Sequence, residues 1–515
     1  MLDRLYRLDP ERPDLLDAAP RAAEGPAGVG SLALLTDLYQ VTMAQGYHAA
    51  GIAEHEAVFN LFFRRAPFKG GYAVAAGLEL VIDLLERFRF TDDDRAYLGA
   101  LTGNDGRPLF SSEFLGALGE LRFTCDVDAI PEGRVAFAHE PLVRLRGPLW
   151  QCQLLETPLL NLVNFSTLIA TKSARICAAA EGDPVLEFGL RRSQGIDGAL
   201  TAARAAVIGG CAATSNVLAG KLHGIPVRGT HAHAWVMAFP SELEAFEAYA
   251  RVMPNNCVFL VDTYDTIEGV HHAVAVGRRL RERGHALAGI RLDSGDLRAL
   301  SVAARSILDE AGFEDASIVA SNDLDEHEIA ALKAAGAKIG VWGVGTRLAT
   351  AYDQPALGGV YKLAAIRGPG EPWRYTIKLS EEPIKVSNPG LQQVRRERGG
   401  DGRFVGDRIY EVELGLGDHA VALEGGARVE HGARGDDLLV PIFRGGRRVY
   451  DSPTTTVMRS RCAEELAALP DDVRRLSGPA VYPVALDARL AALKGSLLQA
   501  AREQVEASER EHAAD

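Results

Sequence analysis

The chain has 515 residues, with 47% apolar and 24% charged side chains and a formal net charge of −13 from 56 basic and 69 acidic groups. These fractions exclude a disordered or fibrous chain, and the acidic balance argues against a nucleic-acid-binding protein with a broad basic face. No apolar run approaches the roughly 20 residues needed to span a bilayer, and the charged start lacks the apolar stretch of a signal peptide. The six cysteines show no CxxC spacing, so neither a disulfide framework nor a zinc site is expected. We therefore expect a cytoplasmic globular protein with no membrane and no nucleic-acid partner.

The first 150 residues divide into a leader and a mixed region. Residues 1–30 are rich in Pro, Ala, Arg and Gly, a composition that is typical of a mobile terminus. A helical pattern begins at Leu34, and the apolar, aromatic run Val58–Phe63 that follows predicts a strand. We assign residues 31–150 to an N-terminal α+β domain.

The middle third, residues 151–362, predicts an α/β catalytic domain. Short apolar runs that end in Gly, Asp or Asn predict strands over Val185–Gly189, Ile225–Gly229, Val258–Asp262, Gly289–Asp293, Ile318–Asn322 and Ile339–Gly343. Amphipathic stretches between them predict helices over Glu242–Met253, Ile267–Arg283, Leu297–Glu310 and Glu326–Ala335. Continuous apolar strands that alternate with helices indicate parallel strands covered on both faces, in a βα sheet or barrel.

The chain changes character after about residue 360. We expect residues 363–480 to form a β-rich segment that completes the N-terminal domain, and residues 481–515 to form a C-terminal helix. Within the β-rich segment, Arg395–Arg403 (RRERGGDGR) is typical of a solvated hairpin turn.

Polar groups stand at the carboxyl ends of the predicted parallel strands, where they converge on one face. They are Arg191, Arg192, Thr230, His233, Asp262, Asp265, Arg291, Asp293, Asp296, Ser321, Asn322, Gly343, Gly345 and Thr346. Glycines followed by a hydroxyl residue offer N–H groups to phosphate, arginines suit phosphate and carboxylate, and aspartates suit ribose hydroxyls or magnesium. Each residue also has a plainer interpretation: GVGT as a tight turn, an aspartate as a helix cap, Arg191–Arg192 as a surface pair. Their joint occurrence at successive strand ends favours a phosphate, sugar and carboxylate site.

Read as strings, several segments closely resemble nicotinate phosphoribosyltransferase. They are LLTDLYQVTMAQGY (34–47), FFRRAPFKGGYAVAAGL (62–78), LLETPLLNLVNFSTLIATKSAR (154–175), GLRRSQGIDGALTA (189–202), TSNVLAGKLHGIPVRGTHAHAW (214–235), LVDTYDT (260–266), IRLDSGDL (290–297), GVGT (343–346) and LGGVYKL (357–363). The resemblance runs in order over about residues 31–400, and beyond residue 400 the match is poor. It implies the type II phosphoribosyltransferase fold, an irregular (β/α) barrel with a second α+β domain built from both chain ends.

The same resemblance implies an activity in NAD salvage and pyridine nucleotide biosynthesis. Nicotinate and phosphoribosyl pyrophosphate would give nicotinate mononucleotide and pyrophosphate, with Mg²⁺ as cofactor and ATP as a co-substrate that is hydrolysed, so that the enzyme would be classed as a ligase. We also expect a homodimer with a shared active site, because relatives take an aromatic residue from the neighbouring subunit.

Roles carry over by position. His233 matches the histidine that ATP phosphorylates, Thr230 and Arg291 match nicotinate contacts, and Tyr39 matches the aromatic that stacks on the pyridine ring. Thr346 matches a contact to phosphoribosyl pyrophosphate. Arg191 resembles a pyrophosphate-contacting arginine, Asp262 and Asp293 resemble carboxylates near the ribose and magnesium, and Asp293 is the expected magnesium ligand. Ser321, Gly343 and Gly345 join the expected substrate-binding residues from their places at strand ends.

Some positions depart from the family pattern. Ala234 stands where many relatives have a serine, and Asn60 where a glutamate is common. His231 lies two residues before His233, so either imidazole is a candidate for phosphorylation, and the alignment of the GTxAH string favours His233.

Four other interpretations remain open from the sequence. Nicotinamide phosphoribosyltransferase would share the fold and the phosphohistidine, and quinolinate phosphoribosyltransferase would be shorter and would not use ATP. A catalytically idle phosphate-binding homologue would retain the fold without the reaction. An unrelated barrel aldolase or isomerase would need a Schiff-base lysine or a metal cluster at the strand ends, and Lys362 in VYKL is better suited to phosphate.

Overall fold

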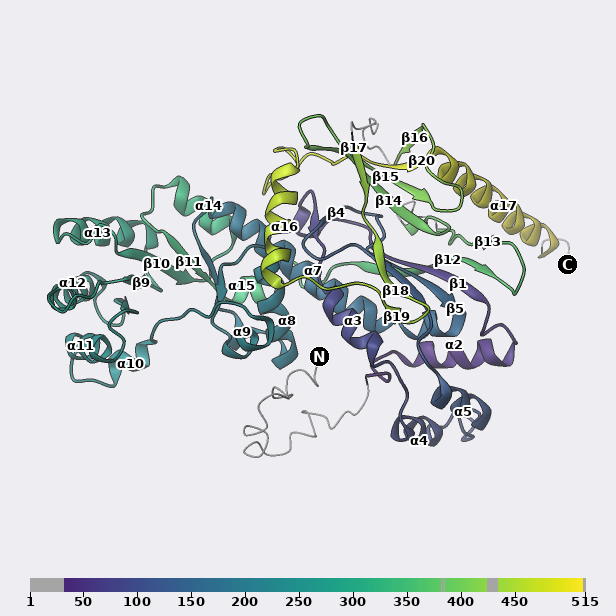
Figure 1. Cartoon of the computed structure of the whole chain (residues 1–515), viewed down its shortest axis with the longest axis horizontal. Coiled ribbons are helices and arrows are strands. Elements are labelled where there is room, and N and C mark those ends of the chain that lie inside the picture. The colour runs from purple at the N-terminus through teal and green to yellow at the C-terminus, as the bar shows by residue number, and fades with distance from the viewer. Residues whose placement is uncertain (1–31, 381, 383–384, 424–433, 513–515) are drawn as a thin grey trace. The chain divides into compact units, whose positions relative to one another are not determined.

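A computed structural model of the chain describes residues 32–380, 382, 385–423 and 434–512, and the predicted leader over residues 1–30 lies outside them. The chain divides into two compact units (Figure 1). The first unit comprises Met1–Thr167, Ala356–Pro453 and Ala463–Asp515, and the second comprises Leu168–Pro355 and Thr454–Cys462. Helices α7 (Glu156–Ala179) and α16 (Thr455–Ala468) contribute residues to both units.

The first unit is built mainly of antiparallel sheet. Its seven-stranded sheet has the order β13-β12-β1-β5-β3-β18-β19, its five-stranded sheet has the order β16-β20-β15-β14-β17, and β2 pairs with β4. The strands are β1 (Glu56–Phe63), β2 (Ala73–Val74), β3 (Asp126–Ala129), β4 (Val135–Ala136), β5 (Val143–Pro148), β12 (Gly359–Arg367), β13 (Arg374–Tyr375), β14 (Gln392–Arg398), β15 (Phe404–Glu411), β16 (Ala420–Ala422), β17 (Arg434–Asp437), β18 (Val440–Arg444), β19 (Arg447–Arg448) and β20 (Val484–Asp487).

The helices of the first unit lie before, between and after these strands along the chain. They are α2 (Leu38–Ala49), η2 (Pro67–Lys69), α3 (Leu78–Glu86), α4 (Asp92–Ala100), α5 (Ser112–Glu120), α6 (Leu149–Leu154) and the C-terminal α17 (Ala488–His512). Strand β1 pairs antiparallel with both β5 and β12, and its run EAVFNLFF is buried from Ala57 to Phe63. A strand buried on both faces reads as a continuous apolar run, which is why the sequence predicts it over Val58–Phe63.

The second unit carries a six-stranded parallel sheet of order β7-β6-β11-β10-β9-β8. Its strands are β6 (Val185–Glu187), β7 (Ala213–Thr214), β8 (Val258–Leu260), β9 (Gly289–Leu292), β10 (Ser317–Asn322) and β11 (Val341–Val344). Its helices are η3 (Leu190–Arg192), α8 (Gly195–Ile208), α9 (Val217–His223), α10 (His233–Met237), α11 (Glu242–Val252), α12 (Thr266–Glu282), α13 (Leu297–Glu310), α14 (Glu326–Ala334) and α15 (Thr346–Ala349). Because β11 returns to pair with β6, the strands follow one another around an interrupted barrel, and the expected α/β fold is confirmed.

The strand predicted over Ile225–Gly229 is wrong. This segment makes only a single parallel bridge, between Thr214 and Val227. Pro226 lacks a backbone N–H, so the segment cannot donate a regular ladder of hydrogen bonds. The barrel is interrupted between β7 and β8, which are the two edge strands of the sheet. Next to β8, a side chain replaces a strand, because the Leu260 N–H of β8 donates to Nε2 of His231 at 3.3 Å.

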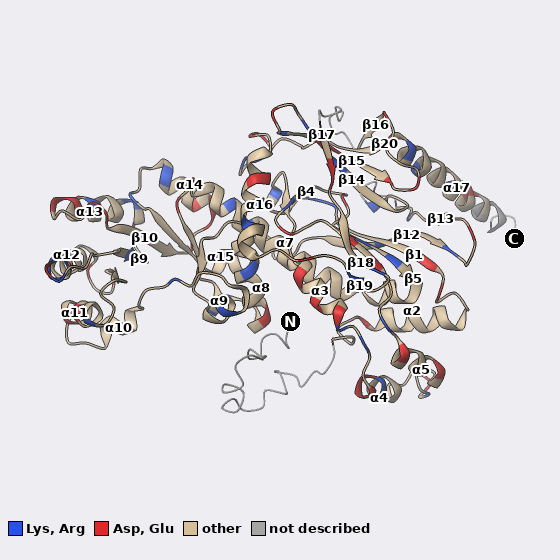
Figure 2. Cartoon of the chain, viewed as in Figure 1, with Lys and Arg blue, Asp and Glu red and all other residues tan. Residues whose placement is uncertain are grey.

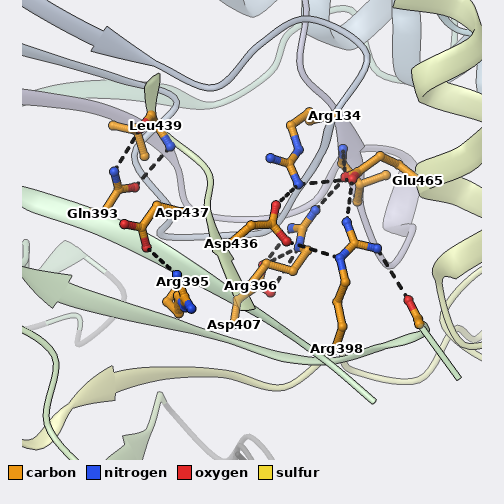
Figure 3. Close-up of polar contacts among 12 residues, drawn as sticks. Arg134, Gln393, Arg395, Arg396, Arg398, Asp407, Asp436, Asp437, Leu439 and Glu465 are labelled. Carbon is orange, nitrogen blue, oxygen red and sulfur yellow. Dashed lines mark hydrogen bonds and ion pairs between the residues drawn. The ribbon is translucent and has the colours of Figure 1, made fainter. Parts of the chain in front are cut away.

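The solvated turn predicted over Arg395–Arg403 is wrong in part. Strand β14 continues to Arg398 and β15 begins at Phe404, so the turn is confined to the residues between them. Arg396 is fully buried and pairs with Asp407 at 2.6 Å and with Glu465 at 2.7 Å. Figure 3 shows Arg134, Arg396 and Arg398 gathered around Glu465. The arginines of this string therefore alternate between a partly exposed face and a buried ion-pair cluster.

Acidic and basic residues are interspersed along the helices, for example in α12 and α13 (Figure 2). Among the described residues, no helix combines the length and apolar character that crossing a bilayer requires.

Candidate active site

The predicted strand-end residues of the second unit are brought to one edge of its parallel sheet. Arg291 of β9 is in register with Leu260 of β8 and with Val319 of β10, and Ser321 of β10 is in register with Gly343 of β11. Asp262 follows β8 by two residues and Asp293 follows β9 directly. Since parallel strands end at the same edge, the side chains that follow them meet there.

Arg291 and Thr230 form a direct contact. Nη1 of Arg291 donates to Oγ1 of Thr230 at 2.5 Å, while Nε of Arg291 is buried and has no hydrogen-bond partner. Burial lowers the pKa of the Arg291 guanidinium, although nearby Asp293 and Asp262 oppose the shift. A half-buried guanidinium with a buried, unpartnered N–H can bind an anionic group, because pairing would recover its desolvation cost.

His233 begins α10 and stands beside Asp293. Its Nε2 lies 3.8 Å from Oδ2 of Asp293, and both side chains are partly exposed, at 40% and 33%. Its Nδ1 lies 3.1 Å from Oγ1 of Thr263, and Asp293 accepts a hydrogen bond from the Ser321 hydroxyl. The imidazole is therefore oriented by a hydroxyl and remains reachable from solvent.

Asp262 organises the turn that follows β9. Its Oδ2 accepts from the Asp293 N–H at 2.8 Å and from the Ser294 hydroxyl at 2.7 Å. Its Oδ1 is buried without a hydrogen-bond partner. Asp262 thus fixes the position of Asp293 and keeps one oxygen available for a ligand.

His231 differs sharply from His233. It is buried against Phe246, Tyr249 and Phe259, and its Nε2 accepts from the Leu260 N–H. Burial lowers the pKa of His231 to about 4, so the ring is neutral at pH 7. Both ring nitrogens face backbone groups, since Nδ1 lies 3.4 Å from the Ala232 carbonyl oxygen. His231 therefore serves the fold, and His233 presents the accessible imidazole.

The glycines in and directly after β11 lie in close packing. A Cβ on Gly343 would lie 2.8 Å from the ring of Phe188, and one on Gly345 would lie 3.2 Å from the Phe188 carbonyl oxygen. Thr346 begins the short helix α15, and the adjacent Arg347 pairs with Asp325, the N-cap of α14. The GVGT turn is thereby pressed against the end of β6.

Arg191 and Arg192 lie on η3, directly after β6, with both side chains exposed. Next to this turn is a cavity of about 510 Å³, lined by Leu190, Ser193, Gly195, Ile196, Ala199, Leu200, Ser215, Asn216, Val217 and Leu218. Asn216 is 3% exposed, and its Nδ2 has no hydrogen-bond partner. Sequence reasoning assigned no role to Asn216 or Thr263, although both stand in strings that resemble the family.

Four further residues named in the sequence analysis lie elsewhere or cap helices. Asp265 and Asp296 are N-caps, of α12 and α13, as the plainer interpretation of strand-end aspartates allowed. Tyr39 lies on α2 of the first unit with 48% of its surface exposed, and Lys362 is half-buried in β12 of the same unit. In the part of the chain that the structure describes, no group of three or more His, Cys, Asp and Glu residues is arranged to hold a metal ion.

The interrupted parallel barrel, its polar strand ends and the additional antiparallel unit define the fold of the type II phosphoribosyltransferases. The chain superposes on the crystal structure of human nicotinic acid phosphoribosyltransferase with a TM-score of 0.77 and 34% identity, over 90% of this chain and 99% of that one.

Sequence comparison narrows the class to one family. Family models of the N-terminal and C-terminal domains of nicotinate phosphoribosyltransferase (NAPRTase) match residues 34–164 and 425–494. The nicotinate phosphoribosyltransferase of Bacillus subtilis is 45% identical over 88% of this chain and 93% of its own length. Nicotinate phosphoribosyltransferase pncB2 of Mycobacterium tuberculosis H37Rv is 45% identical over 89% and 92%. The chain belongs to the nicotinate phosphoribosyltransferase family, and the expectation of a poor match beyond residue 400 is wrong.

Proposed function

We propose that the chain transfers the phosphoribosyl group of phosphoribosyl pyrophosphate to nicotinate in NAD salvage, and that ATP drives the reaction by phosphorylating His233. The observation that carries the proposal is a double link between the segment that contains Thr230 and His233 and the end of β9. Arg291 bonds Thr230 at 2.5 Å, and Asp293 faces His233 at 3.8 Å. A carboxylate-binding cation, an acid group and a nucleophilic imidazole thus share one edge of the sheet.

Arg291 suits the carboxylate of nicotinate. One of its nitrogens is occupied by Thr230, and the buried Nε has no partner, so a carboxylate would satisfy the remaining donors. Charge-assisted hydrogen bonds to a carboxylate are about twice as strong as those between neutral groups. This difference favours nicotinate over nicotinamide.

The transfer forms a bond between the pyridine nitrogen and the anomeric carbon of the ribose while the bond to pyrophosphate breaks. Positive charge develops on the ribose, and the carboxylates of Asp262 and Asp293 would stabilise it. Ser321 and Asp262 hold Asp293 in place for this task. Arg191, the glycines Gly343 and Gly345, and Thr346 would contact the phosphate groups through guanidinium, backbone N–H and hydroxyl donors.

A magnesium ion fits the donor set without a complete protein cage. Mg²⁺ commonly takes one or two carboxylates together with substrate phosphates, and the unpartnered Oδ1 of Asp262 and the carboxylate of Asp293 are such ligands. When bound, the ion would neutralise charge on the leaving pyrophosphate. Its binding by Asp293 is part of the proposal.

His233 would accept the γ-phosphoryl group of ATP, with ADP as the leaving group. Its 40% exposed side chain is accessible, and the hydroxyl of Thr263 orients its ring. Phosphorylation adds negative charge beside Arg291 and so would alter the affinity for anionic substrates. We extend the proposal to a cytoplasmic homodimer in which the exposed Tyr39 completes the partner's active site.

The test is incubation of purified protein with nicotinate, phosphoribosyl pyrophosphate and Mg²⁺, with and without ATP, while mononucleotide and ADP are measured together. We expect both products in a fixed ratio when ATP is present. His233→Ala should abolish ADP formation while slow transfer persists, and His271→Ala, which changes an exposed histidine on α12, should retain both. Equal ADP formation by His233→Ala and the unsubstituted protein would refute the phosphohistidine.

A further inference from the structure

Glu187 is a buried carboxyl group that the proposed reaction leaves without a role. It ends β6 and is 2% exposed. Its Oε1 accepts from the Gly189 N–H at 2.5 Å, and its Oε2 accepts from the Thr214 hydroxyl at 2.5 Å. Both donors are neutral, and burial raises the pKa of Glu187. A carboxyl group is costly to bury without a cation, so its position calls for an explanation.

The first oxygen of Glu187 fixes the turn that carries Arg191. Gly189 donates its N–H to Glu187, and its carbonyl oxygen accepts from the backbone N–H groups of Arg192 at 2.8 Å and of Ser193 at 3.1 Å. A Cβ on Gly189 would lie 2.2 Å from the Cβ of Ala349, so the peptide has little room to move. The orientation of this one peptide sets the direction of η3.

The second oxygen of Glu187 fixes a different turn. The Thr214 hydroxyl that donates to Glu187 also accepts from the Asn216 N–H at 3.0 Å. Asn216 in turn accepts from the Ala219 N–H through its own Oδ1, which leaves its unpartnered Nδ2 free for a ligand. The carboxyl group therefore also sets the place of Asn216.

Both turns line one cavity. Leu190 and Ser193, which flank the two arginines of η3, line the cavity of about 510 Å³, and so do Ser215 and Asn216. Glu187 is hydrogen-bonded to both turns, to the first through Gly189 and to the second through Thr214.

We propose that Glu187 is a positioning residue that holds the Arg191 turn and the Asn216 turn in register, and thereby sets the affinity for phosphoribosyl pyrophosphate without touching it. This inference rests on the proposed function, because it takes Arg191 as a pyrophosphate contact. A guanidinium recognises phosphate through a rigid fork of donors, so a small rotation of η3 is expected to weaken binding more than it slows the bond-breaking step.

The test is the steady-state kinetics of Glu187→Gln and Thr214→Val. A glutamine offers one acceptor oxygen in place of two, so one of the two turns loses its anchor. We expect the KM for phosphoribosyl pyrophosphate to rise about tenfold in Glu187→Gln and about threefold in Thr214→Val, with kcat within about twofold. Because both residues belong to one hydrogen-bonded network, the effects of the two changes should be less than additive in the double variant.

A matched control is Glu242→Gln, which changes a buried carboxyl group of α11 in the same unit and should leave this KM unchanged. An unchanged KM in both Glu187→Gln and Thr214→Val, with or without a lower melting temperature, would show that Glu187 serves only the fold and would overturn the inference. If Glu187→Gln fails to fold, Thr214→Val decides. Absence of transfer by the unsubstituted protein would instead overturn the proposed function.

Discussion

Two arginines, one fully buried in the first unit and one half-buried in the second, show what distinguishes a structural charge from a functional one. Arg396 in the first unit is fully buried and bonds Asp407 and Glu465 through three of its nitrogens. Burial by itself would lower the pKa of Arg396, but these carboxylates hold that pKa well above its usual range. Arg291 in the second unit bonds a neutral hydroxyl, and burial lowers its pKa.

The difference lies in how completely each charge is paired. A buried cation whose donors all meet carboxylates has nothing left to offer a ligand, and its removal strands the partners. A buried cation with an unpartnered donor is held at a cost that a bound anion would remove. Complete pairing therefore indicates a structural role, and incomplete pairing at a strand end indicates a binding site.

The largest expected effect is on stability, in Arg396→Met. Removal of the guanidinium would leave Asp407 as a buried carboxylate without its cation and would take one of three arginine partners from Glu465. We expect this change to lower the free energy of unfolding by about 3–5 kcal/mol. Urea denaturation measures it. Arg395→Met is the matched control on the same strand, because its side chain is 33% exposed and its ion pair with Asp437 is long, at 3.6 Å; a change below about 1 kcal/mol is expected there. Similar losses in both variants would break the comparison.

Arg291→Lys should affect activity and leave the fold intact. Lysine keeps the charge but loses the planar fork, so we expect kcat/KM for nicotinate to fall about 100-fold, equivalent to about 2.7 kcal/mol of transition-state stabilisation. Unfolding free energy should change by less than about 1 kcal/mol. A stability loss as large as that of Arg396→Met, without loss of activity, would place Arg291 among the structural charges.

The pH dependence of stability should reveal the burial of His231. Since burial lowers the pKa of His231 to about 4, the unfolded chain binds a proton there more readily than the folded one. Stability from this residue is complete above about pH 6.5 and falls as the pH decreases toward 4, by about 2–3 kcal/mol. Urea denaturation across this range should show a flatter profile for His231→Gln. A profile for His231→Gln as steep as that of the unsubstituted protein would contradict this prediction.

The smallest expected effect concerns Thr263, whose hydroxyl lies 3.1 Å from Nδ1 of His233. One hydrogen bond of this kind contributes about 1 kcal/mol, so Thr263→Val should slow ADP formation about fivefold. Thr263→Ser keeps the hydroxyl and should restore most of the rate. If Thr263→Val forms ADP at the unsubstituted rate, the orientation of His233 does not depend on this contact.

Local patterns predicted the parallel unit well. Helix α13 spans Leu297–Glu310 as expected, because an amphipathic stretch between a strand and a glycine is a local signal. The strand ends were also found locally, since each apolar run stops at a polar residue, and Arg291, Asp293 and Ser321 follow from that rule. The specific roles of those residues came from the family resemblance.

Long-range partners were beyond such reasoning. Arg396 is buried because Glu465, 69 positions away, meets it, and the sequence around RRERGGDGR carries no trace of that partner. The error of predicting a strand at Ile225–Gly229 has a related cause. The backbone of Leu260 at the edge of the sheet bonds the side chain of His231 and not another strand. The role of Glu187 likewise depends on Thr214, which is near only after folding.

The discontinuous make-up of the first unit bears on how the protein is made. Strand β20, near the C-terminus, lies between β15 and β16 in the five-stranded sheet, and β12 pairs with β1 from early in the chain. A ribosome adds about 5–20 residues per second, so β1 waits roughly 15–60 s for β12 to be synthesised. Nearly all of the parallel unit is translated within that interval, so the edge of β1 that pairs with β12 stays unpaired until the chain has been made as far as Arg367 of its 515 residues.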